Sequence, residues 1–113
     1  MEQLIAYINH IAPVSKAARE ELIPLFRPDQ LTAGEFFIQE GQYAQEIAFL
    51  QKGCVRAYFV NRKGKEYNKN FFVGPSIIGA YTSLLKKQPN KIAQRALTDC
   101  LIMRAPYHQI EQL

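Results

Sequence analysis

Apolar residues recur at helical spacing near the start of the chain. The first set predicts a helix that Pro13 ends, and it consists of Leu4, Ile5, Ile8 and Ile11. A second helix is expected after Ser15, a residue suited to cap it, with Ala18, Leu22, Ile23 and Phe26 on one face. Pro24 is expected to kink or shorten this second helix, and Arg27-Pro28-Asp29 is interpreted as a turn.

The glycines mark a β unit in the middle of the chain. All six lie between residues 34 and 79, and most gaps fit one strand plus one turn. The flanks 1–33 and 80–113 contain none, so we expect helices, then strands, then a helix followed by strands. The predicted strands cover 36–38, 47–50, 55–60, 66–73, 92–98 and 100–105, with a hairpin loop at 61–65 in which Gly64 takes a left-handed conformation.

Strand alternation assigns faces within residues 55–60. Val55, Ala57 and Phe59 are expected to face the interior of the β unit. Arg56 and Tyr58 are expected on the outside, packed against a helix.

The run FFVGPSIIGAYTSLL, residues 71–85, combines a strand, a glycine and a helix start. The strand ends at Gly74-Pro75, and Gly79 is expected to open a short helix; a positive φ at this position would be one reason for a glycine. This geometry presents backbone N–H groups to an anion, although a plain helix cap explains it equally well. A basic loop follows at 86–91, and a last short helix begins at Tyr107 with Ile110 and Leu113 on one face.

Composition fits one globular domain of 113 residues, of which 48% are hydrophobic. The chain has no apolar run long enough for a membrane span, and its start lacks the features of a secretion signal, so we expect a cytoplasmic protein without a membrane partner. The net charge of +4 is uneven, because residues 1–50 carry −4 and residues 51–113 carry +8. The second half suits an anion, either a small ligand or a nucleic acid, unless it is only a solvated basic surface.

Metal and enzyme chemistry have little support in the sequence. Cys54 and Cys100 are expected to be buried free thiols. His10 and His108 have no metal-ligand partners at suitable spacing, and the absence of histidine between them argues against a cupin-like enzyme. We therefore predict no catalytic residues, no metal site and no enzymatic activity.

Several segments occur in the order found in one known family, namely "TAGEFFIQEGQ", "IAFLQKGCVRAYF", "NRKGKE", "YNKNFFVGPSIIGAY" and "QRALTDCLIMRAP". From about residue 5 to 113 the chain resembles the cyclic-nucleotide-binding domain, and more closely the sensor half of Crp/Fnr-type bacterial transcription regulators. The resemblance implies a mainly β fold, a double-stranded β-helix (β-roll or jelly roll) flanked by helices. Residues 1–28 would form the N-terminal helices, 29–105 the β-roll with a cassette helix at 79–86, and 107–113 the start of a dimer helix. The C-terminal helix-turn-helix DNA-binding domain of the family would lie outside this chain.

The resemblance also implies a ligand site around a phosphate-binding cassette from Ile78 to Ile92. Its candidate ligand-binding residues are Ile78, Gly79, Ala80, Tyr81, Thr82, Asn90, Lys91 and Ile92, with Ala57 and Phe59 where the family seats the base. Each of four of these residues has a structural role as the alternative to ligand binding. Lys91 would be a solvated loop residue, Ala57 and Phe59 would pack in the core, and Tyr81 would anchor the short helix.

Two departures from the family pattern affect the expected ligand. Ala80 replaces the acid that holds the ribose, and Asn90 or Lys91 lies where the family has a phosphate-binding arginine. Arg95 is expected to point away from the site. Each lost contact is a charge-assisted hydrogen bond that would contribute roughly 1.5–3 kcal/mol to the free energy of binding, so tight binding of cAMP is not expected.

Two functions stay open at this point. The chain is either a sensor for a cyclic nucleotide (cAMP-like) or another small anionic effector, or a degenerate module of the same fold used for dimerisation or partner contact. In both cases no other cofactor is expected, DNA would be bound only through the missing helix-turn-helix domain, and the full-length protein would be a homodimer. The present chain is expected to be a monomer or a weak dimer.

Overall fold

The computed structural model describes residues 2–11 and 14–113. Its N-terminal part contains the helices α1 (Glu2–Ile11) and α2 (Lys16–Leu22) and the 3₁₀ helix η1 (Ile23–Leu25). The side chain of Ser15 caps α2 by accepting a hydrogen bond of 3.1 Å from the N–H of Ala18. The predicted shortening by Pro24 is confirmed, because α2 ends at Leu22 and the chain tightens into η1. The prediction that Pro13 ends the first helix lies outside the described residues.

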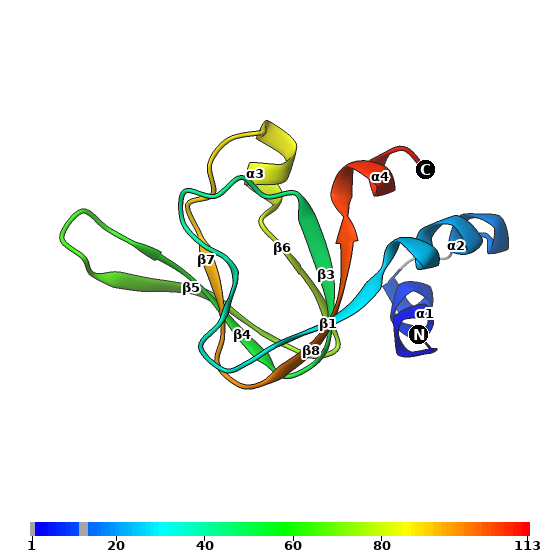
Figure 1. The fold of residues 1–113 in the computed structure, drawn as a ribbon, viewed down its shortest axis with the longest axis horizontal. Helices are drawn as coiled ribbons and strands as arrows, with labels where there is room; N and C mark the ends of the chain where they lie inside the picture. The colour runs from blue at the N-terminus through cyan, green and yellow to red at the C-terminus, as the bar shows by residue number, and fades with distance from the viewer. Residues whose placement is uncertain (1, 12–13) are drawn as a thin grey trace.

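The strands form two four-stranded antiparallel sheets (Figure 1). Their bounds are β1 (Arg27–Leu31), β2 (Phe36–Ile38), β3 (Glu46–Lys52), β4 (Cys54–Val60), β5 (Glu66–Val73), β6 (Ser76–Gly79), β7 (Ala93–Ala96) and β8 (Cys100–Pro106). One sheet has the order β1-β8-β3-β6 and the other the order β2-β7-β4-β5. Two short helices complete the fold, α3 (Tyr81–Lys86) and α4 (Tyr107–Glu111). The predicted mainly β fold with flanking helices is confirmed.

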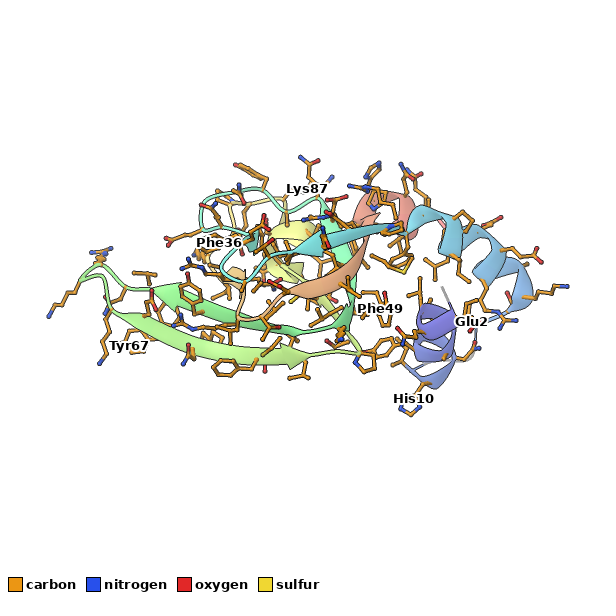
Figure 2. The ribbon with its side chains drawn as sticks, turned by 60° about the horizontal axis from the view of Figure 1, so that its bottom comes forward. Glu2, His10, Phe36, Phe49, Tyr67 and Lys87 are labelled. Atoms are coloured by element: carbon orange, nitrogen blue, oxygen red, sulfur yellow. The ribbon has the colours of Figure 1, made fainter. Side chains whose placement is uncertain are left out.

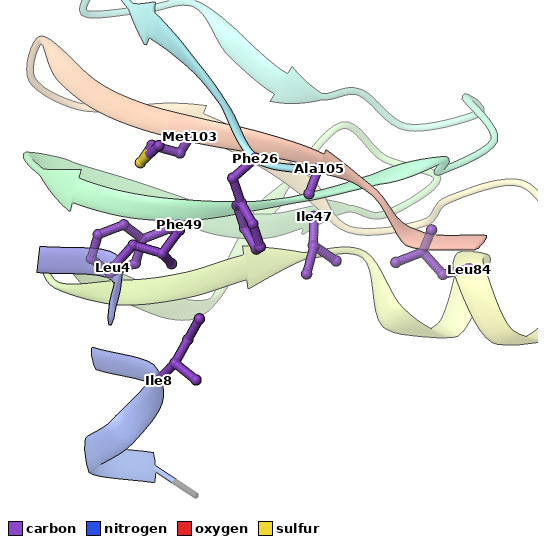
Figure 3. Packing of buried hydrophobic residues seen from close by; sticks show 8 residues of the cluster. All are labelled: Leu4, Ile8, Phe26, Ile47, Phe49, Leu84, Met103 and Ala105. Carbon is purple, nitrogen blue, oxygen red and sulfur yellow. The ribbon is translucent and has the colours of Figure 1, made fainter. Parts of the chain in front are cut away.

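Strand β3 is buried on both faces and joins two hydrophobic clusters. Ile47 and Phe49 face the N-terminal helices, where Leu4, Ile8 and Phe26 pack against them (Figure 3). The alternate residues Ala48 and Leu50 belong to a second cluster, which also contains Val55, Ile78, Ala96 and Ile102. Burial on both faces explains why the sequence is apolar without interruption from Ile47 to Leu50.

The prediction of a turn at Arg27-Pro28-Asp29 is wrong, because these residues open β1. Pro28 lies opposite Met103 in the antiparallel pair of β1 and β8. A proline cannot donate a ladder hydrogen bond, and it is tolerated here because β1 is an edge strand of its sheet. Outside the ladder, Arg104 of β8 pairs with the carboxylate of Asp29 at 2.6 Å.

The hairpin of β4 and β5 projects beyond the rest of the roll (Figure 1), and Tyr67 lies on its projecting part (Figure 2). A register shift interrupts the pairing between Ala57 and Tyr58. Phe59 is therefore only half-buried and stacks on Tyr67 with ring centroids 5.0 Å apart, so its predicted place in the interior is wrong.

The outer face of the same hairpin also differs from expectation. Tyr58 is buried beneath the guanidinium of Arg56, which lies 4.0 Å from the ring centroid. Arg56 pairs with Glu66 of β5 at 2.8 Å. The expected packing of Arg56 and Tyr58 against a helix is therefore wrong, because the cover comes from the hairpin itself.

None of the described helices combines the length and the apolarity that crossing a membrane requires.

Candidate functional site

A cavity of about 450 Å³ lies between α3, the loop that follows it, β7 and the β4–β5 hairpin. We call it the α3 cavity. Eight of the ten predicted site residues line it: Ala57, Gly79, Ala80, Tyr81, Thr82, Asn90, Lys91 and Ile92. The sequence did not single out seven other lining residues: Lys69, Asn70, Phe72, Ser83, Gln88, Pro89 and Gln94.

The two remaining predicted residues do not line the α3 cavity. Ile78 is fully buried and packs in the second hydrophobic cluster, because alternation along β6 turns its side chain into the core. Phe59 lines a neighbouring hollow, which shares Lys69, Lys91 and Ile92 with the α3 cavity.

Gly79 ends strand β6 and does not open the helix. It pairs with Ile47 of β3, and its φ is not in the positive range, so the predicted reason for a glycine is wrong. The actual reason is space, because a Cβ at this position would lie 2.9 Å from Cγ2 of Ile47. Helix α3 begins at Tyr81, and Ala80 precedes it as an N-cap without a side-chain hydrogen bond.

Two buried polar side chains hold the loop between α3 and β7. Ser83 accepts from the N–H of Ala44 at 3.0 Å and donates to the carbonyl of Gln88 at 2.6 Å. Asn90 donates to the carbonyls of Gln39 and Ile92 and accepts from the N–H of Ile92. The amide of Asn90 is therefore committed to the loop, and this side chain shapes the cavity wall.

Gln94 of β7 is the least expected residue of the wall. It is 4% exposed, and its Nε2 donates to the carbonyl of Gly79 at 3.1 Å. Its Oε1 is buried and has no hydrogen-bond partner among the described residues. The sequence did contain a signal, because placing Arg95 on the outside of the strand places Gln94 on the inside.

Positive charge flanks the α3 cavity. Lys69 and Lys91 are exposed residues at its lining, and no Asp or Glu lines it within the described part of the chain. The Nζ of Lys69 lies 5.1 Å from the ring centroid of Phe59. Desolvation by burial raises the pKa of the Tyr81 hydroxyl above its ordinary value, which is itself well above physiological pH, so this side chain is a neutral hydrogen-bonding group.

A second hollow of about 500 Å³ lies beside β1, β8 and α4. Its two arginines are already neutralised, because Arg27 and Arg104 both pair with Glu46, and Arg104 also pairs with Asp29. This hollow therefore offers an anion less uncompensated charge than the α3 cavity.

Metal ligands and reactive thiols do not form a site in the described residues. No group of three or more His, Cys, Asp and Glu residues lies close enough together there to hold a metal ion. Cys54 and Cys100 are free thiols, as predicted, with Cys54 half-buried and Cys100 buried. Burial raises the pKa of the Cys100 thiol, which keeps it protonated.

The sequence of residues 28–113 matches the family model of the cyclic nucleotide-binding domain. The chain belongs to this family. It is a family of non-catalytic regulatory domains. No curated protein matches the chain.

Several solved structures share this fold at low sequence identity. The sensor domain of the transcriptional regulator DNR from Pseudomonas aeruginosa has a TM-score of 0.84 and 17% identity, over 98% of this chain and 74% of that one. The regulatory subunit of a cAMP-independent protein kinase A from Trypanosoma cruzi has a TM-score of 0.85 and 15% identity, over 97% of this chain and 38% of that one. The Thermus thermophilus catabolite activator protein has a TM-score of 0.76 and 14% identity, over 88% of this chain and 46% of that one. The domain thus spans less than half the length of the last two chains.

The structure shows which charges the predicted cassette residues bring to the α3 cavity. Ala80 lines the cavity without a carboxylate, and Asn90 uses its amide within the loop. Arg95 does point away, as predicted, because its Nε donates to the carbonyl of Gly34 at 2.7 Å and its guanidinium lies over Phe36. The cations left at the cavity are therefore lysines, which offer point charges and not a bidentate fork.

Proposed function

We propose that this domain is the ligand-sensing part of a Crp/Fnr-type transcription regulator and that its α3 cavity binds a small anionic effector. The observation that carries the proposal is the cavity itself, flanked by Lys69 and Lys91 and free of lining carboxylates in the described residues. The effector would act on a helix-turn-helix DNA-binding domain outside this chain, in a homodimeric full-length protein. The fold shared with the sensor domain of DNR over 98% of the chain supports this context.

The effector is a cyclic nucleotide or another small anion of similar size. Proteins with this fold are described with different ligands: the Trypanosoma cruzi subunit as bound to guanosine, a Xanthomonas campestris regulator as responsive to c-di-GMP, and PfPKA-R as bound to cAMP. Loss of the acid and of the arginine fork weakens the case for cAMP, because each charge-assisted contact contributes roughly 1.5–3 kcal/mol.

The alternative is a module of the same fold that contacts a partner and binds no nucleotide. The replacement of the ribose-binding acid by Ala80 favours this second function. Both functions predict the same fold, so the response to ligands separates them.

A thermal-shift titration tests the proposal. The panel is cAMP, cGMP, c-di-GMP and guanosine, each up to the millimolar range. A ligand at about 100 times its Kd stabilises a domain by about 2.7 kcal/mol, which raises Tm by several degrees. Saturable stabilisation by one anionic compound supports a sensor, and a flat response across the panel favours the partner-binding module.

Charge variants locate the binding site in the same assay. Replacing Lys69→Gln and Lys91→Gln together should remove most of the ligand-induced shift, because both cations flank the cavity. The matched control replaces Lys16→Gln and Lys52→Gln, which removes the same charge from exposed residues that do not line it. An equal loss in both double variants would contradict specific binding at the α3 cavity.

A further inference from the structure

The α3 cavity differs in polarity between its inner wall and its rim. We call inner wall the lining residues that are buried, namely Ala57, Gly79, Ala80, Ser83, Asn90 and Gln94. We call rim the lining residues that are exposed, namely Lys69, Asn70, Tyr81, Thr82, Pro89 and Lys91. A ligand that enters the cavity therefore meets two different chemical environments.

The polar side chains of the inner wall are already bonded within the protein. The hydroxyl of Ser83 accepts one hydrogen bond and donates another, and the amide of Asn90 makes three. The Nε2 of Gln94 donates to the carbonyl of Gly79, and its Oε1 is enclosed by the protein. The inner wall therefore offers a ligand mainly apolar contact, and most of the surface that lines the cavity is apolar.

The charge of the α3 cavity lies on one side of its rim. Lys69 and Lys91 line both the cavity and the neighbouring hollow beside Phe59, which places the two cations close to each other. Glu40 lines that hollow but not the α3 cavity. Neither lysine forms an ion pair with a carboxylate in the described part of the chain. Both ammonium groups are therefore available to an anion at the rim.

The size and the polarity of the cavity disfavour two classes of anion. Its volume of about 450 Å³ lies in the range of about 300–1,000 Å³ that sites for small organic molecules occupy. A bare inorganic anion would leave the apolar inner wall uncovered. A nucleotide fills the space, but its ribose hydroxyls and ring nitrogens would lose hydration against the inner wall without gaining partners.

We infer that the effector is an aromatic carboxylate, with its ring against the inner wall and its carboxylate at the rim beside Lys69 and Lys91. This inference rests on the proposed function of the α3 cavity and names the class of anion that it takes. The half-buried ring of Phe72 also belongs to the lining, and contacts between aromatic rings are attractive beyond the area that they bury.

The two parts of such a ligand have separate effects on binding. The ring is held by apolar contact, which does not depend on charge. A lysine ammonium is a point charge, so it attracts a carboxylate without the fixed geometry of an arginine fork. A neutral carboxamide of the same shape keeps the apolar contacts and loses the charge, so it should bind about tenfold more weakly.

The test compares carboxylates with their own amides by calorimetry. The pairs are benzoate and benzamide, 2-naphthoate and 2-naphthamide, and indole-3-acetate and indole-3-acetamide. The nucleotides of the thermal-shift panel and inorganic phosphate represent the other ligand classes. For at least one pair the wild-type protein should bind the carboxylate about tenfold more tightly than the amide, and more tightly than any nucleotide or phosphate.

The rim lysines should account for this ratio. In the double variant Lys69→Gln and Lys91→Gln, the Kd of the carboxylate should rise to that of the amide, whereas the Kd of the amide should stay unchanged. Unchanged binding of the amide shows that the variant is folded with an intact cavity. The control double variant Lys16→Gln and Lys52→Gln should keep the wild-type ratio, because neither residue lines the cavity.

The possible results separate this inference from the proposed function. Equal binding of both members of every pair, or an unchanged ratio in the variant of the rim lysines, would overturn the inference. Tighter binding of a nucleotide or of phosphate than of every carboxylate would also overturn it, while the function as a sensor for an anion stands. A wild type that binds none of the probes would overturn the proposed function, and the inference with it.

A crystal structure of the wild type with the tightest carboxylate tests the orientation directly. The expected result is a carboxylate oxygen within about 2.7–3.2 Å of Nζ of Lys69 or Lys91, with the ring in contact with the inner wall. A carboxylate that points toward the inner wall, with its ring at the rim, would overturn the inference.

Discussion

Gly79 contributes both to the packing of the core and to the wall of the α3 cavity. Because it has no Cβ, strand β6 can approach Ile47 of β3 closely, and its carbonyl is then available to hold the amide of Gln94. The close approach and the buried amide are coupled, since moving β6 away from β3 would also move the carbonyl that fixes Gln94.

A substitution at Gly79 tests this coupling. Gly79→Ala should destabilise the domain by about 1–3 kcal/mol, because the new methyl group overpacks against Cγ2 of Ile47. Urea unfolding followed by circular dichroism measures the loss. Adding Ile47→Leu, which removes the branch at Cβ, should restore part of it. If Gly79→Ala unfolded at the same urea concentration as wild type, Ile47 would accommodate the new methyl group without loss of stability, which contradicts the prediction.

Asn90 is the second residue whose role follows from its contacts. Asn90→Ala removes three hydrogen bonds from a side chain that is 4% exposed and leaves the carbonyl of Gln39 without that donor. We expect a loss of about 1–3 kcal/mol in the free energy of unfolding, measured in the same urea assay. The control is Asn9→Ala at an exposed position of α1, which should change the free energy of unfolding by less than about 0.5 kcal/mol. Similar values for the two variants would contradict the assignment of Asn90 to the loop.

At the scale of elements, local patterns predicted most of the roll. The glycine spacing placed the strands, and the uninterrupted apolar run from Ile47 correctly indicated a buried one. The failures have tertiary causes: the edge position of β1 makes Pro28 acceptable in a strand, and the projecting hairpin leaves Phe59 half-buried. Strand alternation opposite Arg95 could have placed Gln94 on the inner face, but its hydrogen bond to Gly79, fifteen residues away, is a tertiary contact that no local pattern predicts.

Strand β1 is held by ion pairs that depend on pH. The N–H of Gln30 and the guanidinium of Arg104 hold the pKa of Asp29 below its ordinary value. Because the pKa of Asp29 is lower in the folded state than in the unfolded state, its carboxylate stabilises the fold at pH values above the ordinary pKa of an aspartate. This contribution is lost as the pH falls through the pKa of the folded state. Asp29→Asn should therefore be less stable than wild type at pH 7, by a modest amount because 44% of the side chain is exposed.

The difference in Tm between wild type and Asp29→Asn should shrink as the pH falls below about 4, and it should vanish once the pH is below the lowered pKa of the folded carboxylate. Thermal unfolding between pH 2 and pH 7 measures it. A difference that stays constant down to pH 2 would mean that the loss in the variant comes from packing and not from charge.

At the scale of the whole molecule, the charge gathers at the end that contains the α3 cavity. Residues 60–91 carry seven basic side chains and one acidic one, giving +6, so the remainder of the chain carries −2. Figure 1 shows the tip of the hairpin at the far side of the molecule from α1 and α2, whereas the junction of β5 and β6 at Pro75 lies beside α1. The basic residues of the segment lie in the hairpin, in β5 and at 86–91, away from that junction. Such a separation produces a positive potential around the cavity entrance.

The charged end should attract anionic effectors in a salt-dependent way. Raising the NaCl concentration from 0.1 M to 1 M shortens the Debye length from about 10 Å to about 3 Å, which screens the surrounding lysines. The Kd of an anionic ligand from the nucleotide panel should therefore rise severalfold in calorimetric titrations, whereas binding of the neutral nucleoside guanosine should change little. If the Kd of both ligands rises equally, salt acts on the protein and not on the electrostatic attraction of the ligand. If neither changes, the lysines of the hairpin and of the α3 loop contribute nothing to affinity, and recognition depends on contacts inside the cavity alone.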